Sequence, residues 1–135
     1  MDNCIYCKVI KGELPSFKVY EDKEFLAFLD IYPHALGHTL IIPKKHVSNI
    51  LELNDNEAKS LIVVIRKVMH LIEDKLEPDG FNVGWNHNSA GGQAIPHLHV
   101  HIFPRYQNDG GGNVHSIIKN PGDRSVEEIA KLFKS

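Results

Sequence analysis

The chain has 135 residues, 15 Lys and Arg against 17 Asp and Glu, and a formal net charge of −2 at pH 7. This length fits one domain with one core, and a near-neutral charge without a basic stripe argues against binding to nucleic acid or a membrane surface. No apolar run approaches a membrane span and the N-terminus lacks signal-peptide features. We therefore expect a cytoplasmic protein whose two cysteines stay reduced.

Residues 3–11 begin with these two cysteines, Cys4 and Cys7, in what we expect to be a helical turn. Two cysteines at this spacing form a common half-site for a tetrahedral zinc ion. A pair of thiols without a function has the same spacing, and the sequence leaves both interpretations open.

Three strands are expected next, over residues 17–20, 25–29 and 37–43. Asp30 ends the second strand, where an acid often caps a turn. His38 shares a strand face with Leu40 and Ile42 and so points inward. It is either a core residue or a partner for other histidines.

One long amphipathic helix follows Asn54, which can act as its N-cap, with Glu57 completing a capping box. Its apolar side chains recur at helical spacing and predict a core-facing stripe, namely Ala58, Leu61, Ile62, Ile65, Val68, Met69, Ile72 and Leu76. The turn at 78–80 ends the helix.

A fourth strand is expected over residues 81–86, followed by a loop that contains Gly91 and Gly92. Glycines allow a close backbone approach, and successive free N–H groups can cradle a phosphate. Near the C-terminus, Ser125 begins a capping-box pattern and a short helix in which no chemistry is visible.

The most informative stretch is residues 96–103, where His97, His99 and His101 alternate with apolar residues. In a strand this places the three imidazoles on one face. A histidine-rich surface strand is the alternative to a functional site. Three chemistries fit the row: a metal centre, general acid–base catalysis, or nucleophilic attack by one imidazole on phosphorus. The adjacent glycine loop favours the third, because its donors suit phosphate oxygens.

This run resembles the signature of the histidine-triad (HIT) family of nucleotide hydrolases and transferases, and the similarity covers about residues 4–106, including 28–31, 37–46, Asn86 and 91–93. The resemblance implies an α+β fold with a five-stranded antiparallel sheet, one long helix and short terminal helices. Residues 1–106 are then the HIT domain, and residues 107–135 a C-terminal loop and short helix packing on the same domain. It also implies a homodimer in which two sheets join.

The resemblance further implies a purine nucleotide substrate, either a nucleoside phosphoramidate or a dinucleoside polyphosphate, cleaved at its α-phosphorus through a nucleotidyl-histidine. The catalytic residues are then His99 as nucleophile, His101 beside the leaving group, and His97 and His38 as supporting histidines. The expected nucleotide-binding residues are Asp30, Ile31, Asn86, Gly92, Gln93, Ala94, His99 and His101. A nucleotide-binding regulatory module with little turnover and a metal-dependent hydrolase remain alternatives.

Some bacterial relatives hold a structural zinc ion, and the matching ligands here are Cys4, Cys7, His46 and His97. No catalytic metal is expected. Two positions depart from the family pattern: Ala94 stands where Ser or Thr is frequent, and no tryptophan follows Trp85. In relatives the hydroxyl at the first position donates to the phosphate, and phosphoramidate-cleaving relatives carry a C-terminal tryptophan near the partner's site. Both departures therefore weaken an assignment to the phosphoramidate-cleaving branch.

Overall fold

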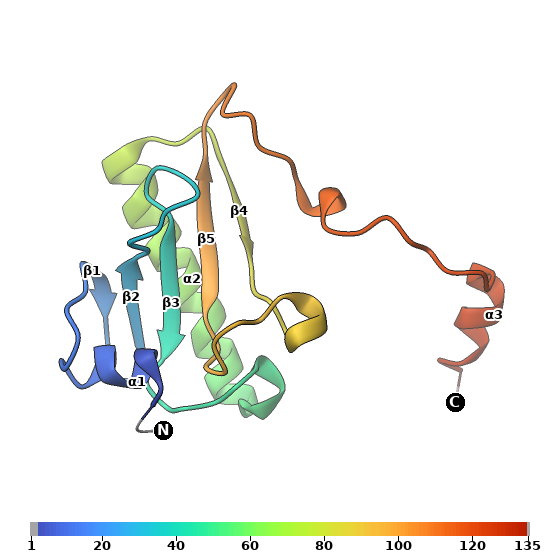
Figure 1. The fold of residues 1–135 in the computed structure, drawn as a ribbon, viewed down its shortest axis with the longest axis horizontal. Coiled ribbons are helices and arrows are strands. Elements are labelled where there is room, and N and C mark those ends of the chain that lie inside the picture. The colour runs from blue at the N-terminus through green and yellow to red at the C-terminus, as the bar shows by residue number, and fades with distance from the viewer. Residues whose placement is uncertain (1–2, 135) are drawn as a thin grey trace.

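The computed structural model describes residues 3–134, and its centre is one antiparallel sheet of five strands in the order β1-β2-β3-β5-β4 (Figure 1). The strands are Lys18–Glu21 (β1), Phe25–Leu29 (β2), Thr39–Pro43 (β3), Gly80–Gly84 (β4) and Val100–Arg105 (β5). The helices are Ile5–Ile10 (α1), Asp55–Leu76 (α2) and Val126–Lys131 (α3), with short 3-10 turns at Ile50–Glu52, Ser89–Gly91 and Val114–Ser116. The predicted fold class is confirmed.

Helix α2 begins and ends where the local signals place it. The Asn54 side chain accepts from the Glu57 N–H, and the Glu57 side chain accepts from the Asn54 N–H, so both halves of the capping box form. Glu77 ends the helix in the left-handed region, directly before a proline that cannot continue it. The predicted stripe is wrong at two positions, because Ile62 is 54% exposed and Leu76 39% exposed, and it omits Val64, which is buried.

The core lies on both faces of the sheet. Helix α2 covers one face, where Phe25, Ile41 and Val100 belong to the larger apolar cluster. On the opposite face a smaller cluster joins Tyr6 of α1 to side chains of β2 and β3. The histidines share this second face, so α1 lies beside them while α2 supports the sheet from behind (Figure 1).

The histidine stretch enters the sheet later than expected, because β5 begins at Val100 instead of residue 96. Pairing between β3 and β5 ends at Ile41 and Val100. Beyond this point Pro43 has no N–H to donate, and the Leu98 N–H instead donates to the Val47 carbonyl at 2.8 Å. His97 and His99 therefore lie in the irregular segment that leads into the strand.

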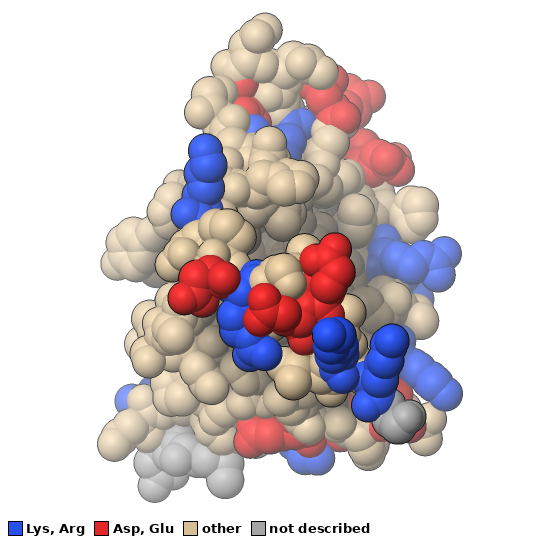
Figure 2. Space-filling view, turned by 90° about the vertical axis from the view of Figure 1, so that its right-hand side faces the viewer, with Lys and Arg blue, Asp and Glu red and all other residues tan. Residues whose placement is uncertain are grey.

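We expected residues 107–135 to pack on the same domain. Residues 107–134 are exposed instead, and α3 lies away from the sheet (Figure 1). The apolar side chains of this segment, such as Ile117 at 80% and Phe133 at 83% exposure, belong to neither core cluster. They therefore remain exposed within one chain. On the face that forms the right-hand side of Figure 1, basic and acidic side chains lie next to one another (Figure 2). Within residues 3–134, no helix is long and apolar enough to span a membrane.

Candidate active site

His99 and His101 lie side by side on the sheet face opposite α2. Their ring centroids are 5.1 Å apart, and His101 pairs with Leu40 of β3. Val100 and Ile102 alternate with them and are fully buried in the core beneath. The alternation of histidine and apolar side chains across the start of β5 thus presents two imidazoles together on one face.

The hydrogen bond of His99 assigns its tautomer. Its Nδ1 lies 2.8 Å from the backbone carbonyl of His97. A carbonyl oxygen only accepts, so Nδ1 carries the proton. The neutral ring then has an unprotonated Nε2. His99 thereby presents the lone pair that a nucleophile needs.

A chain of two hydrogen bonds through His34 and His38 assigns the tautomer of His101 in the same way. The backbone N–H of His34 donates to Nδ1 of His38 at 3.2 Å, so the neutral His38 ring carries its proton on Nε2. That Nε2 lies 2.9 Å from Nδ1 of His101 and donates to it. His101 therefore carries its own proton on Nε2. We expected His38 to support the nucleophile His99. In the structure its hydrogen bond is to His101, which it orients.

Burial keeps these histidines neutral. Burial, followed by the neighbouring His99 and His38, lowers the pKa of His101 to about 4. Burial also lowers the pKa of His38, although the Asp30 carboxylate opposes the change. Both rings are therefore neutral donors or acceptors near pH 7, as their hydrogen bonds require.

Asp30 and Ile31 lie at the edge of this group. One Asp30 carboxylate oxygen accepts from the Tyr32 N–H at 2.8 Å, so the turn-capping interpretation holds for that oxygen. The other oxygen lies 3.7 Å from Nε2 of His38. Ile31 is 65% exposed, and its apolar side chain is open to a ligand.

The glycine loop has a different arrangement from the one we expected. The N–H groups of Gly91 and Gln93 donate to the Asn88 carbonyl at 3.0 Å, and that of Gly92 donates to Ser89 at 2.9 Å. The expectation of free N–H groups at the glycine pair is therefore wrong, because the short 3-10 turn uses them internally.

The side chain of Gln93 also holds this loop. It accepts from the Asn88 N–H at 2.8 Å and donates to the carbonyls of Ser48 and Ile95 at 2.8 and 3.0 Å. Within residues 3–134, the Ala94 N–H has no hydrogen-bond partner, and Asn86 is exposed. These two groups, rather than the glycine N–H groups, remain free for an anion.

The four predicted metal ligands come together around Nδ1 of the His97 ring. One ligand atom from each of Cys4, Cys7, His46 and His97 lies within 4.8 Å of the others. Nε2 of His97 lies 2.8 Å from the Pro43 carbonyl and donates to it, so Nδ1 is unprotonated. This nitrogen faces the sulfurs of Cys4 at 3.4 Å and Cys7 at 3.6 Å. The donor set and its orientation fit a tetrahedral ion.

The histidine row itself does not converge on a metal. Within residues 3–134, the two groups of possible ligands separate His97 from His101, and neither includes His99. The second group contains Asp30, His38 and His101, but the bond between the two histidines already satisfies the nitrogens that face each other. The geometry thus gives no support to a metal centre built from the row.

Sequence reasoning missed Tyr6, which packs edge-on against His99 with ring centroids 5.1 Å apart. Its side chain is 7% exposed, and burial, then the charges of Asp30 and Cys4, raise its pKa to about 12. Its position between Cys4 and Cys7 was the available signal, since a metal site there places α1 on the histidines. Phe103 was also missed; its ring is parallel to that of His101 within 3°.

Comparison with known proteins places this geometry in a family. The family model described as the HIT domain matches residues 11–108. The chain belongs to the HIT family. Protein hit of Bacillus subtilis is 47% identical over 114 residues, which cover 84% of this chain and 79% of that protein. The crystal structure of a HIT family member from Bacillus subtilis has a TM-score of 0.84 and 43% identity, covering 96% of this chain and 92% of that one.

A relative with a named activity also matches this HIT protein. The adenosine 5'-monophosphoramidase of Schizosaccharomyces pombe is 38% identical over 103 residues, which cover 76% of this chain and 74% of that protein. The histidine-triad signature identified in the sequence is therefore confirmed as the mark of the family.

Proposed function

We propose that this HIT protein hydrolyses a purine nucleotide at its α-phosphorus, through a covalent nucleotidyl-histidine on His99, and releases a nucleoside monophosphate. The observation that carries the proposal is the unprotonated Nε2 of His99, which follows from the 2.8 Å hydrogen bond of Nδ1 to the His97 carbonyl. The similarity to an adenosine 5'-monophosphoramidase supports a nucleotide substrate.

In the first step, Nε2 of His99 forms a bond to phosphorus and the bond from phosphorus to the leaving group breaks. The electron pair departs on the leaving atom. That atom receives a proton through the Nε2–H of His101, which is replenished from solvent. In the second step, water attacks phosphorus, loses a proton to solvent and releases His99 with its lone pair restored.

The nucleotide-side contacts follow from the groups left free. Asp30 retains one carboxylate oxygen near the surface for ribose hydroxyls, and Ile31 offers an exposed apolar wall for the base. The Asn86 side chain and the Ala94 N–H are available to phosphate oxygens. Gly92 and Gln93 then act by shaping the loop rather than by direct donation.

The decisive experiment incubates the protein with phosphoramidates of AMP and GMP and with dinucleoside polyphosphates, and measures release of the monophosphate. His99→Asn should lower turnover by several powers of ten, because the nucleophile is removed, while nucleotide binding is retained. Rapid quenching of the wild type should trap an acid-labile nucleotidyl adduct on His99. Binding without monophosphate release from any substrate would instead indicate a nucleotide-binding module, and turnover abolished by a chelator would indicate a metal-dependent hydrolase.

We also propose that Cys4, Cys7, His46 and His97 hold one structural zinc ion per chain. Two thiolates and two imidazoles form a closed tetrahedral set without a position for substrate. The ligands come from α1, the segment after β3 and the start of the histidine stretch, so an ion there links three separate parts of the chain.

Elemental analysis of protein purified without chelator should therefore find about one zinc per chain. Cys7→Ser should lose the metal and lower the free energy of unfolding by a few kcal/mol or more. Ser48→Ala serves as a control, because the Ser48 hydroxyl donates to the carbonyl of Pro96, the residue before His97, at 3.4 Å, and Ser48 is not one of the four ligands. A metal-free protein as stable as one supplied with zinc would refute the site.

The apolar C-terminal segment supports the homodimer as a further part of the proposal. Its side chains, including Val114 at 62%, Ile117 at 80% and Ile118 at 72% exposure, are not covered within one chain. β4 lies at an edge of the sheet, where the corresponding strand of a second copy can join it. A mass of two chains by light scattering is expected, and a monomer at micromolar concentration would contradict it.

A further inference from the structure

Tyr6 of α1 lies against the nucleophile and takes no part in the chemistry proposed above. Tyr6 and His99 are each 7% exposed. Their ring centroids are 5.1 Å apart, and the ring planes cross at 61°. The ring of His101 also borders His99, with centroids 5.1 Å apart and planes at 66°. Two rings from separate parts of the chain therefore pack on the imidazole of the nucleophile.

The hydrogen bond of His99 does not by itself fix its ring. Nδ1 donates to the His97 carbonyl at 2.8 Å, and a single neutral hydrogen bond contributes little net free energy. Rotation of an imidazole about its bond to the Cβ atom has a broad, roughly two-fold preference. A half-turn would place a ring carbon where Nε2 now lies. Packing against neighbouring rings must therefore exclude this orientation.

Tyr6 is itself held on both sides. Its ring centroid lies 5.9 Å from the ring of Phe28 in β2 and 5.9 Å from that of His97. Cys4, two residues earlier, has its sulfur 3.4 Å from Nδ1 of His97. Because these contacts fix α1 on the sheet, Tyr6 presents a fixed ring to the nucleophile.

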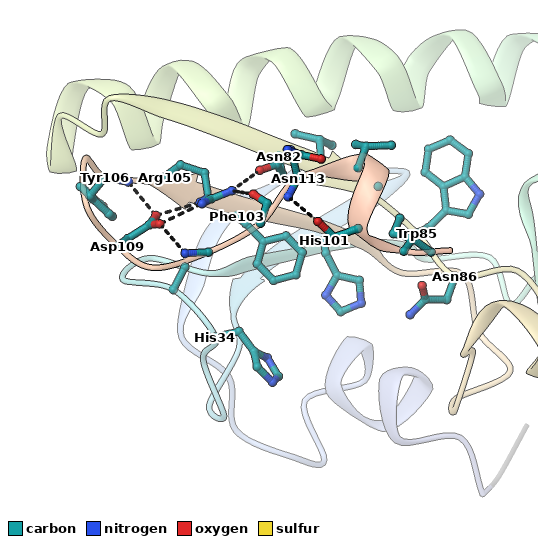
Figure 3. A pocket seen from close by; sticks show the side chains of 18 of the residues that line it. His34, Asn82, Trp85, Asn86, His101, Phe103, Arg105, Tyr106, Asp109 and Asn113 are labelled. Carbon is teal, nitrogen blue, oxygen red and sulfur yellow. Dashed lines mark hydrogen bonds and ion pairs between the residues drawn. The ribbon is translucent and has the colours of Figure 1, made fainter. Parts of the chain in front are cut away.

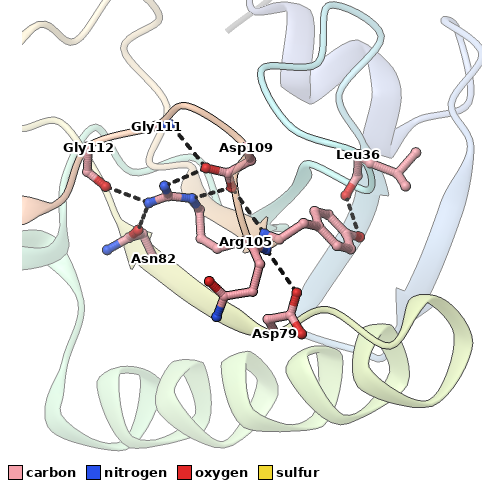
Figure 4. A network of polar contacts seen from close by, with 9 residues as sticks. Leu36, Asp79, Asn82, Arg105, Asp109, Gly111 and Gly112 are labelled. Atoms are coloured by element: carbon pink, nitrogen blue, oxygen red, sulfur yellow. Dashed lines mark hydrogen bonds and ion pairs between the residues drawn. The ribbon is translucent and has the colours of Figure 1, made fainter.

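His101 and β5 are held by contacts that do not involve α1. The ring of Phe103 lies parallel to that of His101 within 3°, and both residues line a cavity of about 900 Å³ (Figure 3). Further along the strand, Arg105 donates to both carboxylate oxygens of Asp109 at 2.8 Å (Figure 4). Removing the Tyr6 ring therefore leaves the strand in place and frees only the ring of the nucleophile.

We propose that Tyr6 is a positioning residue, which keeps the unprotonated Nε2 of His99 directed at the phosphorus of the substrate. The proposal rests on the function proposed above and adds a residue of α1 to those that determine its rate. Tyr6 acts through His99, and it does so with its ring rather than its hydroxyl. Edge-on contacts between aromatic rings stabilise one relative orientation, and attack on phosphorus requires an aligned nucleophile.

The first experiment measures the rate at which the nucleotidyl adduct forms on His99, by rapid quenching with the unsubstituted phosphoramidate of AMP. Tyr6→Leu removes the ring but keeps an apolar side chain, and it should slow adduct formation by about tenfold with KM nearly unchanged. Tyr6→Met, whose flexible side chain fills the space without a ring, should give the same loss. Tyr6→Phe retains the ring and should keep the wild-type rate.

Tyr20→Leu is the matched control for the loss of a tyrosine ring. Tyr20 is partly buried against the larger apolar cluster, on the sheet face that α2 covers. Its replacement should lower stability without slowing adduct formation, because this ring does not contact the nucleophile.

The second experiment reports the state of the His99 ring without substrate, by nitrogen NMR of protein with isotope-labelled histidine at pH 7. In the wild type, one ring nitrogen of His99 should give the signal of a protonated nitrogen and the other that of an unprotonated one. In Tyr6→Leu the two signals should move toward each other, because a released ring exchanges its proton between both nitrogens. Their absence in His99→Asn assigns them.

Three outcomes would overturn the inference while leaving the proposed function intact. The first is wild-type adduct formation in Tyr6→Leu and Tyr6→Met, and the second is unchanged nitrogen signals in both variants. The third is an equal loss of rate in Tyr6→Phe or Tyr20→Leu, which would assign the effect to the hydroxyl or to the stability of the domain. No adduct in the wild type would overturn the proposed function and the inference together.

Discussion

Lowering the pH from 7 to 5 should destabilise the folded protein, chiefly through His101. Its pKa is lowered from 6.5 to about 4 in the folded state. Between pH 4 and pH 6.5 the unfolded chain binds a proton at His101 that the folded chain does not. The contribution of His101 to the free energy of unfolding is therefore fully present above pH 6.5 and is lost as the pH falls toward 4. At pH 5, which lies 1.5 pH units below the unfolded value, the loss is about 2 kcal/mol.

The range from pH 7 to pH 5 distinguishes the titration of the histidines from that of the acidic groups. Asp109 and Glu21 both have lowered pKa values because of cationic partners, Arg105 for the former and Lys18 for the latter, and they titrate below pH 5. Burial also lowers the pKa values of His38 and His97, which contribute in the same direction as His101.

Urea denaturation followed by Trp85 fluorescence at pH 7 and pH 5, with a chelator throughout, measures the effect without a contribution from metal release. His101→Asn should reduce the difference between the two pH values by about 2 kcal/mol. The matched variant at exposed His115, His115→Asn, should retain it. An unchanged free energy of unfolding across the range, or an equal pH dependence in His101→Asn and the wild type, would refute the reasoning.

Two further predictions concern backbone strain and ribose recognition. Gly37→Ala should destabilise the fold by about 1–3 kcal/mol, since Gly37 has a φ of +86° and an added Cβ comes within 2.4 Å of Leu76 Cδ1. Gly12→Ala is the control, because Gly12 has a φ of +79° and open space around it, and it should lower stability less in thermal denaturation. An equal loss in both variants would contradict the argument from the clash with Leu76. Asp30→Ala should weaken binding of ribonucleotides far more than of 2'-deoxy analogues, because only the former lose charge-assisted bonds to both hydroxyls; equal weakening in calorimetry would leave Asp30 as a turn cap.

The sequence by itself determined the features that depend on neighbours along the chain. Asn54, Glu57 and the turn after residue 77 define α2, because capping and helix termination involve groups within one or two turns. The period of two in the histidine stretch put His101 of β5 and His99, just before this strand, on the same side of the sheet. The family signature needed only residue types at fixed spacing, and the expected zinc ligands followed from it.

Tertiary structure alone decided how the individual atoms are used. The Cys4 sulfur and His97 Nδ1 lie 3.4 Å apart although 93 residues separate them, and no periodicity reports such a contact. The tautomer of His101 depends on His38 and His34, 63 and 67 residues earlier in the chain, since 101 − 34 = 67. The glycine loop was misjudged because residue type shows that an N–H can be free, whereas only the folded turn shows where it donates.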